Sequence, residues 1–403
     1  MKDIVLPTFE ADSPTPKAFD TSEWDDAVFE VNRELAIRAL RPASYSSVVD
    51  DMRARDTLES NSGWPLFTRR NKPEVVQASI ADAENGEWHS FPAIALFRNY
   101  RQKTRMVWMF PMSANLVEGS FFQPFQSAIV KRDLAFYAPW VGFERVRALI
   151  TEAYRQGKFV AASDFSSTDN HFRLSTTLAV LPIFKNAFQR QYTALLEDSL
   201  RYMHEIPLVI SQNEYVVGEH GVSSGSNWTN FVETIFDHVF SKYVNKCLKY
   251  PRGFYAIGDD MAWISDDYHE NFNSELEKLG LDVGQQIKAE KTTNDRDSVK
   301  TLQRLFQRGY NRPDGQCRGV YPTIRALNSL IYPERFHNPK DWSSDMFCAR
   351  TYMILENCVD HPLFEEFVKF VVAGQRDLIP FAKKSGPALA RIHRESKLLP
   401  GLN

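Results

Sequence analysis

Two apolar runs between residues 254 and 264 are separated by Gly258-Asp259-Asp260. Short apolar runs that flank a turn signal predict the two strands of a hairpin, with the acids at its tip. A carboxylate is costly to bury in a sheet unless solvent or a cation neutralises it, so the acids are the informative part of the pattern. Taken alone, the tripeptide favours an exposed type I′ turn, for which glycine and aspartate are ordinary residues.

Helical periodicity predicts further elements on both sides of this hairpin. Acids precede the apolar positions of residues 22–40, which predicts a capped amphipathic helix, and residues 143–156 repeat the helical pattern. Residues 1–20 hold three prolines among polar side chains and predict an irregular arm over the surface. Residues 321–403 alternate helical stretches with prolines, which predicts a helical C-terminal sub-domain without chemistry of its own.

An apolar strand predicted from residue 158 ends in Asp164, and a turn of small residues then leads to Asp169. An acid at the open end of a strand is well placed to become a metal ligand. The alternative is structural, because Ser166 or Asp169 can also serve as the N-cap of a following helix.

Cations interleave with aromatic residues over residues 97–111, just before and within a predicted strand. Lys103 and Arg105 fall on one face of an extended chain, so both can reach one polyanion. A solvated run of charge is the alternative. Residues 61–67 form a turn-rich loop that either approaches a phosphate backbone or is merely solvated. Three basic residues follow this loop: Arg69, Arg70 and Lys72.

A loop of glycine and serine over residues 218–230 opens a predicted amphipathic helix. Such a loop presents backbone N–H groups and hydroxyls to a phosphate or a sugar. No Gly-Lys-Ser/Thr follows, so the loop is not a P-loop. His220 is either a pocket ligand or a loop histidine whose ring nitrogens are satisfied by hydrogen bonds.

The chain has 403 residues, of which 43% are hydrophobic, enough for a large core and two or three sub-domains. Its formal charge of -3 means that local basic patches would have to hold any nucleic acid. The four cysteines lack zinc-ligand spacing and predict reduced thiols in a cytosolic protein. No run approaches the roughly 18 apolar residues of a membrane span and no signal-peptide core is visible, so we expect a soluble, unexported protein.

The order of these motifs, taken together, resembles the palm of viral RNA-dependent RNA polymerases, most like those of picobirnaviruses and partitiviruses. The motifs that carry the resemblance cover roughly residues 60 to 310. In chain order they are Ser62-Gly63-Trp64-Pro65, Lys103-Thr104-Arg105, Asp164-Phe165-Ser166 with Asp169, Ser224-Gly225 with Thr229, Gly258-Asp259-Asp260, Lys291 before a threonine, and residues 302–306.

The resemblance implies an α+β right-hand polymerase with an antiparallel palm sheet and a helical thumb. The expected division is an N-terminal arm and fingers (1–155), palm (156–175), fingers insertion (176–210), palm (211–312) and thumb (313–403).

Two divalent ions about 4 Å apart, held by carboxylates of different segments, are the cofactors that nucleotidyl transfer requires. Asp164 and Asp259 are the expected bridging ligands, with Asp260 a weaker one, and oxygen ligands favour Mg²⁺ or Mn²⁺ over zinc. Lys291 is the candidate general acid that protonates pyrophosphate, although Lys288 is an open alternative.

The resemblance also assigns the remaining substrate contacts. Lys103 and Arg105 match cations that hold the incoming triphosphate. The residues expected to bind the nucleotide sugar are Asp169, Ser224, Gly225, Thr229 and Asn230. Glu233 departs from the asparagine that many single-stranded RNA virus enzymes carry, so either Glu233 or Asn230 joins the sugar contact. The residues expected to bind RNA are Arg69, Arg70, Lys72 and Arg304.

The implied function is transcription and replication of a viral double-stranded RNA genome, in the virion interior and the host cytoplasm. The expected partners are RNA template and product, nucleoside triphosphates and viral capsid protein, and we expect a monomer without membrane contact. A non-catalytic RNA-binding or capsid-associated protein is one alternative, and a metal-dependent nuclease is another. A reverse transcriptase is disfavoured by the glycine before Asp259-Asp260, where that family usually carries a bulkier residue.

Overall fold

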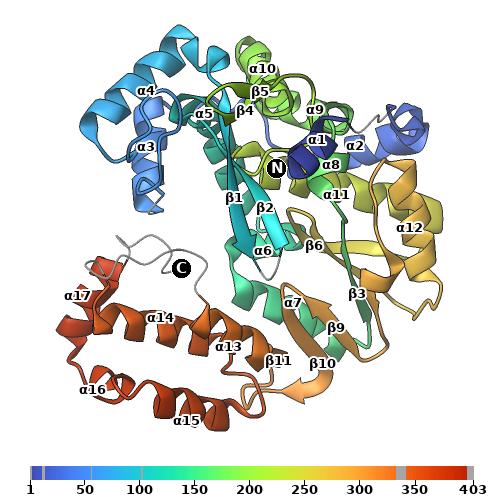
Figure 1. Cartoon of the computed structure of the whole chain (residues 1–403). Coiled ribbons are helices and arrows are strands. Elements are labelled where there is room, and N and C mark those ends of the chain that lie inside the picture. Colours follow the sequence, from blue (N-terminus) through green and yellow to red (C-terminus); the bar gives the residue numbers. More distant parts are fainter. Residues whose placement is uncertain (1, 11–13, 56, 101–102, 333–341, 397–403) are drawn as a thin grey trace. The chain divides into compact units, whose positions relative to one another are not determined.

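The computed structural model describes residues 2–10, 14–55, 57–100, 103–332 and 342–396. The chain divides into two compact units, Met1–Thr301 and Leu302–Asn403. The elements of both units are labelled in Figure 1. The helices of the first unit are α1 (Lys2–Glu10), α2 (Ser22–Leu35), α3 (Tyr45–Ala54), α4 (Pro73–Asn85), α5 (Met112–Lys131), α6 (Ala138–Val141), α7 (Phe143–Arg155), α8 (Thr168–His171), α9 (Leu174–Ala187), α10 (Thr193–Glu205), α11 (Trp228–Leu248) and α12 (Phe272–Asp282).

One four-stranded antiparallel sheet carries the acids of the predicted hairpin. Its strands lie in the order β6, β7, β3, β8, with bounds β3 (Phe159–Asp164), β6 (Arg252–Ile257), β7 (Asp260–Ser265) and β8 (Thr293–Asn294). The predicted hairpin is therefore confirmed as β6 and β7. The strand predicted to end in Asp164 is confirmed as β3, which pairs with β7 along its whole length.

Helix α11 is the central helix of the first unit. Buried residues occur on every side of it, including Phe231, Phe236 and Phe240, which is the pattern of a helix enclosed within a core. It contacts β6 and α2, so the sheet that carries the acids rests on a rigid support. The predicted helix over residues 22–40 is confirmed as α2, but it ends at Leu35 because Ala36 adopts a left-handed conformation (φ 47°).

A second sheet has the order β2, β1, β4, β5, with bounds β1 (Ala93–Tyr100), β2 (Lys103–Met109), β4 (Leu208–Ser211) and β5 (Glu214–Val216). Strands β1 and β2 form a long antiparallel hairpin (Figure 1), in which Arg98 is the cross-strand partner of Arg105. Part of α5 packs in the same apolar core as this sheet, through Leu116 and Val117. The strand β9 (Ser298–Thr301) completes the first unit.

The irregular N-terminal arm predicted over residues 1–20 is wrong for the segment that forms α1. Val5 is 0% exposed and belongs to an apolar core, and the Thr8 hydroxyl donates a hydrogen bond to Asn170 Oδ1 at 3.1 Å. Pro7 removes only one backbone donor from the helix. The tertiary contacts of Val5 and Thr8 outweigh that loss, and they involve residues far along the chain that local pattern does not reveal.

The second unit begins with a hairpin and continues as helices, so the predicted helical C-terminal sub-domain is confirmed. Its elements are β10 (Arg304–Asn311), β11 (Cys317–Val320), α13 (Thr323–Ile331), α14 (Ser344–Glu356), α15 (Phe364–Gly374), α16 (Leu378–Ala382) and α17 (Gly386–Ser396). All four cysteines of the chain are free thiols, as predicted. Across the described residues, no helix is both long enough and apolar enough to span a membrane.

Candidate active site

Three aspartates lie at one end of the acid-bearing sheet. Asp164 is the last residue of β3 and Asp260 is the first of β7, and the two are cross-strand partners. Asp259 immediately precedes Asp260, in the β6–β7 turn. The turn requires Gly258, which adopts φ +57° and whose added Cβ would lie 2.6 Å from Asn230 Nδ2. The left-handed backbone conformation of this turn therefore favours glycine.

Helix α11 holds this turn in place. The buried backbone N–H of Gly258 donates to Thr234 Oγ1 at 2.8 Å. On the opposite side of the turn, the Thr168 hydroxyl donates to Asp259 Oδ2 at 3.4 Å. A buried N–H that lacks an acceptor destabilises a fold, so Thr234 fixes the position from which Asp259 projects.

The acids at this site hold their protons more tightly than isolated carboxyls. Burial raises the pKa of Asp164, and the charge of Asp259 raises it further, whereas Lys291 lowers it. Burial also raises the pKa of Asp259. The pKa of Asp260 rises to about 7, because it is buried beside Asp259 and Asp164. Crowded carboxylates with raised pKa values are groups that a bound cation stabilises.

A cavity of about 780 Å³ opens over these acids. It brings together six of the predicted site residues: Arg105, Asp164, Asp169, Ser224, Asp259 and Lys291. The Lys291 ammonium lies 3.9 Å from Asp164 Oδ2. Cations and carboxylates thus share one water-accessible space, which suits a ligand that carries phosphate groups and a divalent ion.

Sequence reasoning missed several of the residues that line this cavity, among them Arg98, Thr168 and Asn170. The signal for Arg98 was present in the cationic run of residues 97–111. Once the hairpin register is known, Arg98 stands opposite Arg105, so both cations reach the same cavity. Thr168 and Asn170 carry no pattern of their own, because they enter the site through the short helix α8.

The donor set of the site suits a hard divalent cation. Its acids supply carboxylate oxygens from two segments, which are the ligands that Mg²⁺ and Mn²⁺ prefer. Among the residues that the structure describes, no group of three histidine, cysteine or acidic side chains is arranged to hold a metal ion. Mg²⁺ is usually bound by one or two carboxylates together with substrate phosphates and water. The residues present therefore fit such an ion as partial ligands.

Glu233 and Asn230 both lie beside Gly258, one helical turn apart on α11. Asn230 is exposed, whereas Glu233 is buried. Burial raises the pKa of Glu233 well above its usual range, and the charges of Asp259 and Asp169 add to this effect. A protonated carboxyl offers a donor and an acceptor, as an asparagine amide does.

Several predicted site residues have other contacts in the structure. Arg69 forms an ion pair with Glu59 Oε2 at 3.1 Å, and Arg70 donates a hydrogen bond to Asn115 Oδ1 at 2.8 Å. The Thr229 hydroxyl donates to the Ser223 carbonyl at 2.6 Å. Lys72 is the residue before α4. Lys103 is the first residue of β2, and its side chain does not belong to the described part of the structure.

Two more residues that the sequence analysis singled out are not among those that line the cavity. Arg304 belongs to the second unit, where it donates to the carbonyl and the side-chain oxygen of Asn357. His220 is buried, and its ring nitrogens lie 2.7 Å and 3.1 Å from the carbonyl oxygens of Gly221 and Ile206. Burial lowers the pKa of His220 to about 4, and the contacts of its ring hold it within the loop.

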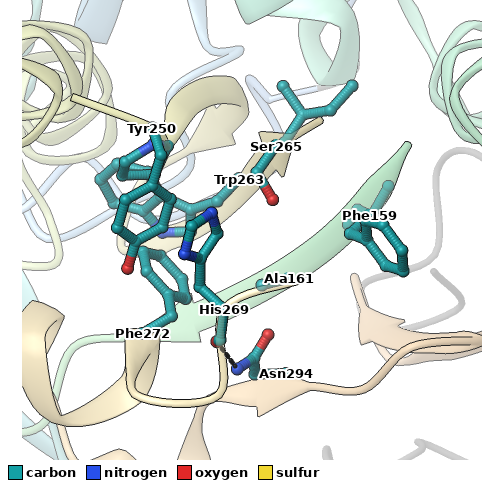
Figure 2. Close-up of a pocket in the computed structure, with 11 residues that line it drawn as sticks. Phe159, Ala161, Tyr250, Trp263, Ser265, His269, Phe272 and Asn294 are labelled. Atoms are coloured by element: carbon teal, nitrogen blue, oxygen red, sulfur yellow. Dashed lines mark hydrogen bonds between the residues drawn. The ribbon is translucent and has the colours of Figure 1, made fainter. Parts of the chain in front are cut away.

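A second, much smaller pocket lies between the sheet and α12, where Figure 2 shows the rings of Tyr250, Trp263, His269 and Phe272. Its volume of about 10 Å³ has room for about one water molecule. Asn294 Nδ2 donates to the His269 carbonyl at 2.9 Å within it. Aromatic packing fills this region, so the cavity over the acids is the better candidate for a functional site.

Known proteins resemble this chain in sequence. A family model described as viral RNA-dependent RNA polymerase matches residues 100–334. A potential RNA-dependent RNA polymerase of human picobirnavirus (strain Human/Thailand/Hy005102/-) is 28% identical over 404 residues, which cover 93% of this chain and 73% of that protein. The RNA-directed RNA polymerase of Cryptosporidium parvum virus 1 (strain KSU-1) is 22% identical over 176 residues, or 43% of this chain and 33% of that protein.

Solved structures resemble the fold. The crystal structure of the RNA-dependent RNA polymerase of a human picobirnavirus matches with a TM-score of 0.79 and 24% identity, over 98% of this chain and 77% of that one. Its insertion-loop deletion mutant matches with a TM-score of 0.81 and 25% identity, over 98% of this chain and 79% of that one. The predicted α+β right-hand polymerase fold is thereby confirmed.

Proposed function

This chain belongs to the viral RNA-dependent RNA polymerases, and we propose that it synthesises RNA on a template by two-metal nucleotidyl transfer at Asp164 and Asp259. The observation that carries the proposal is the cavity in which these acids meet Arg105 and Lys291. Carboxylates for metal ions and cations for phosphates are the two groups that this reaction needs from a protein.

Asp164 and Asp259 would hold the metal ions, and Asp260 would assist them. When bound, two Mg²⁺ or Mn²⁺ ions activate the attacking 3′-hydroxyl and neutralise the charge of the leaving pyrophosphate. The chain itself keeps the carboxylates at the end of a rigid sheet. Thr234 and Thr168 hold the Asp259 turn from two sides, so little reorganisation is required when substrate arrives.

Arg105 and Arg98 would orient the incoming triphosphate from the β1–β2 hairpin, with Lys103 at the start of β2 as a further candidate. The guanidinium groups can form paired hydrogen bonds with phosphate oxygens, and their charge offsets the charge that develops on the leaving group. Burial raises the pKa of Asp259 and of Asp169, and the charge of Arg105 opposes this rise at both acids.

Lys291 would donate a proton to the leaving pyrophosphate as the bond to the α-phosphorus breaks. It lies beside Asp164 and lines the cavity. Lys288 does not line the cavity as described, which favours Lys291 of the two candidates. A protonated lysine is a suitable general acid because it can release its proton to an oxygen on which negative charge accumulates.

Residues of α8 and of the loop before α11 would bind the ribose. Asp169 and Ser224 line the cavity, and Asn230 is exposed next to the Gly258 turn. A protonated Glu233 would support that contact as a donor. Sites built to hydrogen-bond a hydroxyl strongly reject the substrate that lacks it, so these groups would favour ribonucleotides over deoxyribonucleotides.

We further propose that the polymerase copies a viral double-stranded RNA genome within the virion and the host cytoplasm, as a monomer in contact with capsid protein. The fingers would comprise residues 1–155 and 176–210, the palm 156–175 and 211–312, and the thumb 313–403. Basic residues would line the RNA channel. RNA affinity should therefore fall steeply with salt, and affinity that is insensitive to salt would contradict such a channel.

A template-directed synthesis assay tests the function. The chain is incubated with single-stranded RNA, nucleoside triphosphates and Mg²⁺ or Mn²⁺, with and without primer, beside Asp259→Ala. We expect labelled product of template length only from the unaltered chain. Equal product from both proteins would rule out the proposed site. Shortening of the RNA without nucleotides would indicate a nuclease, and RNA binding without either reaction would indicate a non-catalytic RNA-binding protein.

A further inference from the structure

Glu118 is a buried carboxylate in helix α5, with 3% of its surface exposed. Three donors converge on its two oxygens. Ser226 Oγ donates to Oε1 at 2.6 Å, the backbone N–H of Asn227 donates to Oε2 at 2.8 Å, and Asn115 Nδ2 donates to Oε2 at 2.9 Å. Two of these donors belong to the Ser224–Asn227 loop that opens α11, more than one hundred residues away in sequence.

Asn115, one turn earlier on α5, holds the same loop through its backbone and its side chain. Its Nδ2 donates to the Gly225 carbonyl at 3.0 Å, and its own carbonyl accepts from Asn227 Nδ2 at 3.0 Å. Residues 225, 226 and 227 are therefore each bonded to α5. A loop with consecutive attachments of this kind has little freedom to shift along the helix.

The other side of the loop rests on β2. The backbone N–H of Trp108 donates to Ser224 Oγ at 3.2 Å. A Cβ on Gly225 would lie 2.1 Å from the Trp108 carbonyl oxygen, so the glycine allows the loop to lie directly against the strand. Ser224 thus reaches the cavity from a loop clamped between β2 and α5.

We propose that Glu118 is a positioning residue for ribose selection, because it sets the place of the loop that presents Ser224 to the nucleotide. The inference rests on the proposed ribose contact of Ser224. Glu118 lies outside the cavity lining and outside every motif by which the chain resembles its family, so it acts only through the loop.

The hydrogen-bond inventory predicts which substitutions matter. Leucine at this position removes both acceptors and leaves the Asn227 N–H and the Ser226 hydroxyl without their partner. Glutamine keeps one acceptor oxygen, and its amide can donate to Ser226 Oγ, since a hydroxyl also accepts. Glu118→Gln should therefore preserve the loop far better than Glu118→Leu.

The test measures kcat/KM for a ribonucleotide and for its 2′-deoxy analogue during primer extension on an RNA template. The ratio of the two values is the discrimination between ribose and deoxyribose. We expect Glu118→Leu to reduce this ratio about 10-fold to 100-fold, which is the effect of a small misplacement in an active site. Glu118→Gln should restore most of it. Ser120→Ala is the matched control, because Ser120 is a buried residue of α5 whose hydroxyl donates to the Val117 carbonyl within the same helix.

Thermal unfolding of each variant separates loss of fold from loss of positioning. If Glu118→Leu does not fold, Ser226→Ala is used as the test variant instead, because it removes one of the loop donors and leaves Glu118 in place. Its discrimination should fall in the same direction. The inference would be overturned if Glu118→Leu folds and discriminates as well as the unaltered chain. If Glu118→Leu does not fold, unchanged discrimination by Ser226→Ala would overturn it. Failure of the unaltered chain to extend RNA would overturn the proposed function instead.

Discussion

Asp164 and Asp260 are direct cross-strand partners at the open end of β3 and β7. Each strand therefore delivers an acid to the same edge of the sheet, and the turn adds Asp259 beside them. Burial raises the pKa of all three carboxyls, and the charges of neighbouring acids raise it further at Asp164 and Asp260. A cation that shared the charge of these carboxylates would stabilise the arrangement.

Replacing Asp259 by asparagine should lower kcat for nucleotide incorporation by about 1,000-fold or more, since several kcal/mol of charge stabilisation is lost. RNA affinity should change little, because the carboxylate does not attract phosphates. Primer extension and filter binding measure the two quantities. Asp266→Asn is the matched control, as this acid is exposed at the far end of the same hairpin. Comparable loss in both variants would contradict the assignment.

Lys291→Leu should lower kcat by about 100-fold or more if the lysine protonates the leaving pyrophosphate. Lys288→Leu is the control, since its exposed side chain lies three residues away and does not line the cavity as described. Single-turnover kinetics on a defined primer and template measure the chemical step. If Lys288→Leu has the larger effect, the roles of the two lysines must be exchanged.

Thr234→Val should reduce the free energy of unfolding by about 1–3 kcal/mol, because the buried N–H of Gly258 loses its acceptor. The Asp259 turn should also become less well placed, so kcat should fall by about 10-fold or more. Denaturant unfolding and primer extension report the two effects. Ser241→Ala on the same helix removes a bond to the His238 carbonyl and should leave activity unchanged. Equal activity of both variants would show that Thr234 does not position the turn.

Glu118 should make the free energy of unfolding depend on pH. Burial is the main reason that its pKa rises from 4.5 to about 7 in the folded state, although its hydrogen bonds to Ser226, Asn227 and Asn115 oppose this rise. Between pH 4.5 and 7 the folded state then binds more protons than the unfolded state, so the contribution of Glu118 to stability decreases as the pH rises. The decrease is on the order of 3 kcal/mol and is complete above about pH 7.

Glu118→Gln lacks this titration, so the unaltered chain should be more stable relative to it at pH 5 than at pH 7.5. Unfolding temperatures of both proteins across that range measure the difference, and the other buried acids contribute equally to both. Parallel curves for the two proteins would mean that the pKa of Glu118 is not raised.

The sequence by itself predicted the hairpin of β6 and β7 and the strand β3, which carry the acids, whereas the role of the acids as metal ligands stays a prediction. The apolar runs, the glycine at the turn and the order of the motifs were sufficient for this, because the runs and the turn depend on neighbours within a few residues and the order matches a family pattern. Arg105 was predicted from the same local reasoning, as cations on one face of a strand reach one ligand.

Only the tertiary structure decided which polar side chains reach the site and which support it. Arg70 stays a predicted RNA contact, and only the structure shows that its guanidinium donates to Asn115 Oδ1. Arg98 joined the site through the strand register, and Val5 brought an N-terminal helix into the core. Glu118 showed no signal at all. Its role depends on hydrogen bonds to a loop that follows more than one hundred residues later, and such long-range contacts leave no trace in the local pattern of polar and apolar residues.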